Sequence, residues 1–68
     1  MREVQITGDS IRLGQLLRLA DAVDAGSDVK QLLATGEVTV NGEVETRRGR
    51  QLARGDEVST RAEDLKVV

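Results

Sequence analysis

The residues with the clearest chemical potential are the four arginines of the segment from Arg47 to Arg54, which reads Arg-Arg-Gly-Arg-Gln-Leu-Ala-Arg and contains no acid. A guanidinium group stays charged at neutral pH, and its planar set of N–H donors suits phosphate oxygens. The whole chain has a net charge of −2, but a polyanion responds to the local field over about 8–10 Å. The segment therefore predicts phosphate binding. On charge alone, a solvated basic loop that balances an acidic protein explains it equally well.

The residue types that the chain lacks exclude most catalytic chemistry. There is no Cys and no His, so thiol nucleophiles, imidazole acid–base catalysis and zinc clusters are excluded. The hydroxyl, amine and carboxylate groups that remain show no catalytic spacing, and no glycine-rich phosphate loop opens a helix. We therefore expect neither an enzyme nor a cofactor. Without Phe, Tyr or Trp, the chain also cannot stack bases on aromatic rings.

Asp21, Asp24 and Asp28 are the carboxylates that could gather around a hard cation. Their spacing does not match the ligand positions of the twelve-residue calcium loop. Acidic residues near a helix start are common because they interact favourably with the helix dipole. We therefore expect no metal site.

The apolar pattern predicts two short helices that would position the basic residues. Apolar residues spaced at i, i+3, i+4 and i+7 indicate a first helix over residues 13–20, with Gln15 and Arg18 outward. Ser27 and Asp28 suit the start of a second helix over residues 27–35, and Gly36 suits its left-handed end. The helices are expected to pack through Leu13, Leu16, Leu17, Val29, Leu32 and Leu33.

Strands are predicted before and after this helix pair. Residues 4–6 alternate as in a half-buried strand, and residues 37–46 alternate around Asn41-Gly42, a strong hairpin signal. A two-residue loop would pair Val40 with Glu43 and Val38 with Glu45. A three-residue loop would pair Val38 with Val44, and we favour it because it keeps the apolar residues together.

Further strands are expected over residues 57–60 and 65–67, separated from the hairpin by a turn at residues 54–57. The fold class is therefore α+β, with two short helices packed on a small, mainly antiparallel sheet that includes a β-hairpin. The 68 residues are expected to form one domain, residues 1–68, since a chain this short buries only about 60% of its unfolded surface.

Several motifs resemble the RNA-binding domain of the ribosomal protein S-four type. They cover residues 11–58 in order and with near-family spacing: Arg12-Leu13, Leu16-Leu17, Lys30 with Leu32-Leu33, the segment Gly-Glu-Val-Thr-Val-Asn-Gly of residues 36–42, and Gly55-Asp56-Glu57-Val58. Through Gly-Glu-Val-Glu-Thr-Arg of residues 42–47, the chain is most similar to the single-domain bacterial YbcJ-like branch.

The resemblance implies two helices and a hairpin in a compact L-shaped motif (the alpha-L motif) that binds structured RNA, chiefly ribosomal or transfer RNA. Together with the arginine segment, it gives the expected RNA-binding residues: Arg12, Lys30, Arg47, Arg48, Arg50 and Arg54. We expect a non-catalytic monomer, with a ribosomal particle as one candidate partner. Because the sequence has neither a signal peptide nor a run of ~20 apolar residues, we expect it to be cytoplasmic.

Two alternative functions stay open at this point. One is an RNA-targeting subunit of a separate RNA-modifying enzyme. The other is a protein-interaction module whose acidic surface contacts a basic partner. Its residues would be Asp21, Asp24, Asp28, Glu37, Glu43 and Glu45. Fold resemblance alone does not rank these functions.

Overall fold

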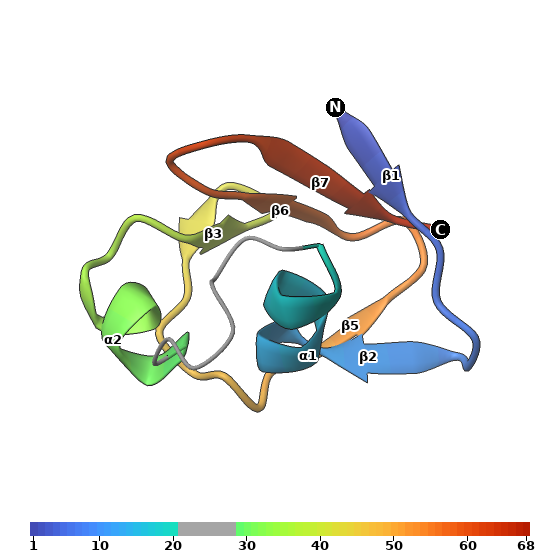
Figure 1. Cartoon of the computed structure of the whole chain (residues 1–68), viewed down its shortest axis with the longest axis horizontal. Coiled ribbons are helices and arrows are strands. Elements are labelled where there is room, and N and C mark those ends of the chain that lie inside the picture. Colours follow the sequence, from blue (N-terminus) through green and yellow to red (C-terminus); the bar gives the residue numbers. More distant parts are fainter. Residues whose placement is uncertain (21–28) are drawn as a thin grey trace.

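The computed structural model describes residues 1–20 and 29–68, and it has the expected α+β architecture (Figure 1). Two helices lie on one side of a mainly antiparallel sheet. The elements in chain order are β1 (Arg2–Val4), β2 (Ser10–Arg12), α1 (Leu13–Leu19), α2 (Val29–Ala34), β3 (Thr39–Val40), β4 (Glu43–Val44), β5 (Gln51–Ala53), β6 (Glu57–Ser59) and β7 (Asp64–Val67). Within these two described ranges, no helix has the length and apolar character needed to cross a bilayer.

Helix α1 buries the leucine face that its spacing predicts. Leu13, Leu16 and Leu17 are fully buried, whereas Gln15 and Arg18 are exposed. The helix ends at Leu19, one residue before the predicted end, and the N–H of the following Ala20 still donates to Leu16 O at 2.9 Å.

Helix α2 contributes two fully packed residues, Val29 and Leu33, whereas Leu32 is only partly buried. Leu32 nevertheless packs against the core, as predicted, with part of its side chain left exposed. Helix α2 ends at Ala34, and Gly36 follows in the left-handed region at φ 78°, as predicted. The predicted start at residues 27–28 lies outside the described residues, as do Asp21, Asp24 and Asp28.

The larger sheet has the strand order β1-β7-β6-β3-β4, in which β1 pairs with β7 in parallel and the other neighbours are antiparallel. Alternate residues of its strands face the helices, as period-two side-chain geometry requires. The buried core comprises Val4, Ile6, Leu13, Leu16, Leu17, Ala20, Val29, Leu33, Val38, Val40, Leu52, Val58, Leu65 and Val67. No aromatic side chain contributes, so branched aliphatic residues fill the space between the layers.

The hairpin register differs from the predicted one. Thr39 pairs with Val44 and Val40 pairs with Glu43, so the loop consists of two residues. Asn41 and Gly42 have φ angles of 52° and 88°, as a type I′ turn needs, because its twist matches that of the strands. In this register Val44 points to solvent with 61% of its surface exposed, whereas Glu45 is buried at 5%. Grouping the apolar residues was misleading because the buried side chain here is the carboxylate of Glu45, directly after β4.

Strands β2 and β5 form a second, two-stranded antiparallel sheet that the sequence did not predict. Ile11 pairs with Leu52, and β2 continues directly into α1 at Leu13. This pairing places the loop that precedes β5 beside the first turn of α1 (Figure 1). The small sheet therefore positions the arginine segment against the helix.

Candidate nucleic-acid interface

The β4–β5 loop, residues 45–50, contacts the N-terminal turn of α1 through backbone hydrogen bonds. The N–H of Leu13 donates to Arg50 O at 2.8 Å, and the N–H of Gly14 donates to Arg48 O at 2.9 Å. These bonds satisfy two of the amides that a helix leaves without intrahelical partners at its start. They also fix the position along α1 at which the loop crosses the helix.

Gly14 permits this close approach. A Cβ atom at position 14 would lie 3.3 Å from the Cβ of Arg48, 3.4 Å from its carbonyl oxygen and 3.5 Å from Cγ1 of Val29. A Cβ here would therefore press on the loop at Arg48 and would be in ordinary contact with Val29 of α2. The glycine lets the backbone that carries Arg48 rest directly on the helix.

Three arginines from three different elements meet around one groove of about 290 Å³. Arg12 ends β2, Arg18 lies on the exposed side of α1, and Arg48 lies in the β4–β5 loop. We call this the basic groove, and it is lined by Arg12, Gly14, Gln15, Arg18, Val29, Arg48 and Gly49. Gln15 accepts a hydrogen bond from the N–H of Arg12 through Oε1 at 3.2 Å, which ties the end of β2 to the helix.

The groove arginines differ from the others in their electrostatic partners. No carboxylate of residues 1–20 and 29–68 forms an ion pair with Arg12, Arg18 or Arg48. Other arginines do have carboxylate partners. Arg47 and Arg50 pair with Glu45, Arg2 with Glu63 at 3.3 Å, Arg61 with Glu37 at 3.5 Å and Arg54 with Asp9 at 3.8 Å. The groove therefore concentrates guanidinium groups whose donors remain available to an anion.

Arg47 and Arg50 are held from inside the loop by the buried carboxylate of Glu45. Nε and Nη2 of Arg47 donate to its two oxygens at 3.2 and 3.1 Å, and Nη1 of Arg50 donates to Oε1 at 3.1 Å. The side-chain and backbone hydrogen bonds from Arg47 lower the pKa of Glu45 from 4.5 to about 2 and outweigh its desolvation. The same contacts raise the pKa of Arg47. Glu45 is therefore a permanent anion at neutral pH.

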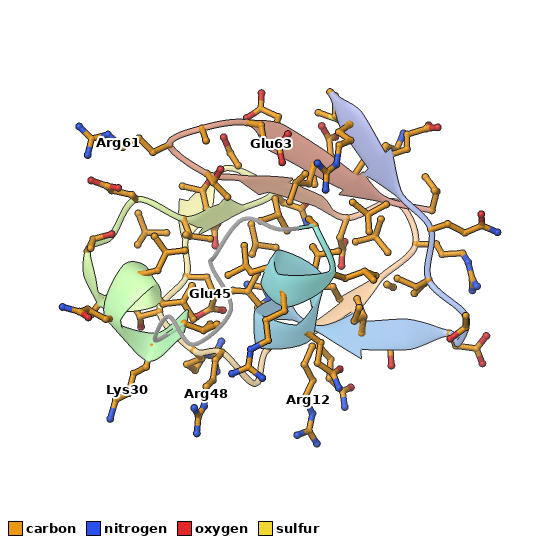
Figure 2. All side chains as sticks on the ribbon, viewed as in Figure 1. Arg12, Lys30, Glu45, Arg48, Arg61 and Glu63 are labelled. Atoms are coloured by element: carbon orange, nitrogen blue, oxygen red, sulfur yellow. The ribbon has the colours of Figure 1, made fainter. Side chains whose placement is uncertain are left out.

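The predicted RNA-binding residues do not form one set. Arg12 and Arg48 line the basic groove, while Arg47 and Arg50 lie on Glu45 beside it, with 77% and 33% of their side chains exposed. Lys30 is exposed on α2, and Figure 2 shows its side chain directed to the same edge of the molecule as those of Arg48 and Arg12.

Arg54 lies apart from this edge. Its Nη2 donates to Ile6 O at 3.2 Å, and its Nη1 lies 3.8 Å from Asp9 Oδ1, so it bridges to the segment between β1 and β2. Arg61 and Glu63 lie on the opposite, sheet side of the molecule (Figure 2).

Arg18 and Glu45 were not recognised as site residues from the sequence. Arg12, Gln15 and Arg18 recur every three residues, which places them on one side of α1, and this spacing was a usable signal for Arg18. Glu45 was assigned to an acidic surface, and this was wrong because it is buried. The signal for it was an acid two residues before the first of the arginines, together with the two-residue hairpin register, which places Glu45 opposite Val38.

Comparison with known proteins agrees with the resemblance seen in the sequence. The chain is 46% identical over 55 residues to the "Probable ribosome maturation protein RlbA" of Bacillus subtilis (strain 168). The matched segment covers 81% of this chain and 78% of that protein. A family model described as "S4 domain" matches residues 4–68. The chain therefore belongs to the S4 domain family.

Proposed function

We propose that this protein binds structured RNA, ribosomal or transfer RNA, through the basic groove and does so without catalysis. The observation that carries the proposal is the convergence of Arg12, Arg18 and Arg48, from three elements, with no carboxylate among the described residues paired to any of them. Guanidinium groups held in a fixed arrangement suit the phosphates of a folded backbone, and phosphate contacts supply much of the affinity for nucleic acid.

The roles of the basic residues follow from their surroundings. Arg12, Arg18 and Arg48 would contact phosphates directly, and Lys30, Arg47 and Arg50 would extend the positive field along the same edge. Arg54 contributes less than was expected, since its guanidinium contacts Ile6 and Asp9.

The relative in Bacillus subtilis carries the name of a probable ribosome maturation protein. On that similarity, we extend the proposal to association with a ribosomal particle. Of the two alternatives, the protein-interaction module is weakened, because Glu45 is buried and cannot belong to an acidic docking surface. An RNA-targeting role beside a separate enzyme would use the same basic groove.

The salt dependence of binding tests the groove. If three phosphates are neutralised, log affinity should fall with log salt at a slope of about −2.1 to −2.7, from ~0.7–0.9 per contact. Binding of a folded ribosomal RNA fragment should then weaken roughly 20- to 40-fold between about 50 and 200 mM salt. Fluorescence anisotropy over this range would measure both quantities.

Alanine variants assign the contacts. Each of Arg12→Ala, Arg18→Ala and Arg48→Ala should reduce the slope by about 0.7–0.9 and weaken all RNA targets alike, because a phosphate contact carries no sequence information. Arg61→Ala is the matched control, since it removes the same charge from the opposite side of the molecule. If the three groove variants kept wild-type affinity and slope, the groove would not be the interface, and a protein partner would become the better interpretation.

A further inference from the structure

Glu45 is an unexpected residue in a surface that is proposed to bind a polyanion. It introduces a negative charge directly beside Arg47 and Arg50, and its pairing with them reduces the positive field of the loop. A binder that relied on charge alone would be improved by losing this carboxylate. Glu45 must therefore contribute to the site in some way other than through its charge.

Among residues 1–20 and 29–68, the donors to the side chain of Glu45 all belong to the β4–β5 loop itself. Oε2 accepts from the backbone N–H of Thr46 at 3.0 Å and of Arg47 at 3.1 Å, and from Nε of Arg47 at 3.2 Å. Oε1 accepts from Arg47 Nη2 and from Arg50 Nη1, both at 3.1 Å. One buried side chain thus bonds the backbone at the start of the loop and the guanidinium groups of Arg47 and Arg50.

The loop is also held on its other side, by α1. The carbonyl oxygens of Arg48 and Arg50 accept from the first two amides of the helix. Arg48 therefore lies in a segment that is restrained from inside by Glu45 and from below by α1. The side chain of Glu45 is buried, and Figure 2 shows Arg48 directed outward at the edge of the molecule. The side chain of Arg48 is exposed, while its backbone carbonyl is held by α1.

We propose that Glu45 is a positioning residue that holds the β4–β5 loop in its RNA-binding conformation, so that the protein selects folded RNA over flexible strands at the cost of some electrostatic attraction. This inference rests on the proposed function. A loop that is ordered before binding loses less conformational entropy on binding, and it offers its arginines at fixed spacings. A folded RNA with matching phosphates benefits from this order, whereas a flexible strand can adapt to an unordered loop almost as well.

Two charge-matched variants separate positioning from electrostatics. Glu45→Gln and Glu43→Gln each remove one negative charge from the same hairpin, but the side chain of Glu43 is exposed. Glu45→Gln should bind a folded ribosomal stem-loop about tenfold more weakly, because Arg47 and Arg50 must then be ordered on binding. Its affinity for a poly-uridine strand should stay the same or rise. Glu43→Gln should change both affinities by no more than about twofold, a surface charge effect.

A third variant keeps the negative charge at position 45 but shortens the side chain. Glu45→Asp withdraws the carboxylate from the guanidinium groups, so it should lose preference for the stem-loop as Glu45→Gln does. The proposal would be overturned if Glu45→Gln bound both RNAs more tightly and Glu45→Asp bound them as the wild type does. Loss of the negative charge alone would then account for the data.

A measurement on the unmodified protein keeps the proposal testable even where a variant does not fold. NMR order parameters of the Arg48 and Gly49 amides without RNA should be near ~0.85, the value of a rigid backbone. Values below ~0.6 would show a loop that is not ordered before binding and would overturn the proposal. Failure of the groove variants Arg12→Ala, Arg18→Ala and Arg48→Ala to weaken binding would refute the proposed function instead, so the two outcomes are distinguishable.

Discussion

The side chain of Asn41 bridges to the turn that contains Asp56: its Nδ2 donates to Asp56 Oδ1 at 3.1 Å. Its Oδ1 accepts from the N–H of Glu57 at 2.9 Å, and its own N–H donates to Glu57 O at 2.7 Å. Asp56 also accepts from the N–H of Ala53 through Oδ2 at 2.8 Å. These contacts join the hairpin turn to the start of β6, so two sequence motifs that lie 15 residues apart form one structural unit.

Replacing Asn41 should destabilise the fold in two separable steps. Asn41→Ala removes the side-chain hydrogen bonds and replaces a residue that tolerates the left-handed region with one that does so less readily at φ 52°, so we expect a loss of about 2–4 kcal/mol in unfolding free energy. Asn41→Gly keeps the left-handed conformation without strain and should lose only about 1–2 kcal/mol. Urea denaturation followed by circular dichroism would measure both. Equal losses in the two variants would mean that backbone conformation contributes nothing at this position.

Truncation of core leucines should have graded effects. Leu17 is fully buried, so Leu17→Ala should cost about 2–5 kcal/mol. Leu32 is only partly buried, and Leu32→Ala should cost about 1–2 kcal/mol. For a chain of this size, with a total stability of roughly 3–10 kcal/mol, the first change approaches complete unfolding. Thermal denaturation would rank the two variants, and a larger loss for Leu32→Ala would contradict the observed packing.

The sequence was sufficient to predict the elements with strong local patterns. The leucine spacing of α1 and the Asn41-Gly42 turn each reflect a local rule that the tertiary structure keeps. Strands β2 and β5 have three residues each, too few to show an alternating pattern, and their pairing depends on contacts about 40 positions apart along the chain. Such pairings follow from the packed fold and not from local sequence.

The hairpin register was mispredicted for a physical reason. Grouping Val38 with Val44 is the correct choice when a strand buries only apolar side chains. Here the buried position belongs to Glu45, whose burial is compensated by hydrogen bonds from Thr46, Arg47 and Arg50. A buried charge is tolerable only when such partners are present. Those partners were visible in the sequence only as an arginine run.

The sequence anticipated part of the grouping of the basic residues but not its geometry. It pointed to the arginines, and Arg12 and Arg48 do lie in one groove, while their role in RNA binding stays a prediction. It could not distinguish arginines that are paired, such as Arg47, from those that are not, because pairing is set by the backbone path of the loop. Arg18 joins the groove because α1 continues directly from β2.

Acid should weaken the fold partly through Glu45. The pKa of this carboxyl is about 2 in the folded protein, against an ordinary value of 4.5, because Arg47 and Arg50 bond its ionised form. Its contribution to stability is therefore fully present above about pH 4.5 and is lost as the pH falls toward 2. The stability difference between wild type and Glu45→Gln should be constant from pH 7 to 5 and should shrink between pH 4.5 and 2. Urea midpoints at several pH values would measure it, and a difference independent of pH would contradict the ion pair.

Gly14 should be intolerant of a side chain, whereas Gly49 in the same groove should not. Gly14→Val would bring side-chain atoms against Arg48 and Val29, so we expect a destabilisation of about 1–3 kcal/mol and weaker RNA binding. A Cβ at Gly49 would have no neighbour within 4 Å, so Gly49→Val is the matched control and should leave the melting temperature nearly unchanged. Similar melting temperatures for both variants would mean that the loop does not rest on α1 as described.

Folded RNA should compete for the protein better than a single strand of equal length. The chain has no Phe, Tyr or Trp, so it lacks the rings on which single-strand binders stack bases. Its groove instead presents guanidinium groups from three elements, an arrangement that matches phosphates already fixed by RNA structure. A flexible strand must be ordered to place its phosphates in the same way, and an ordering cost of only ~1.4 kcal/mol corresponds to about tenfold in affinity.

In competition anisotropy at a fixed salt concentration, a ribosomal stem-loop should therefore displace a labelled RNA at about one tenth of the concentration needed for a poly-pyrimidine strand. The preference should persist when salt is raised, because both competitors lose a similar number of phosphate contacts. Equal displacement by the two RNAs would show that the arginines act only as a diffuse positive field.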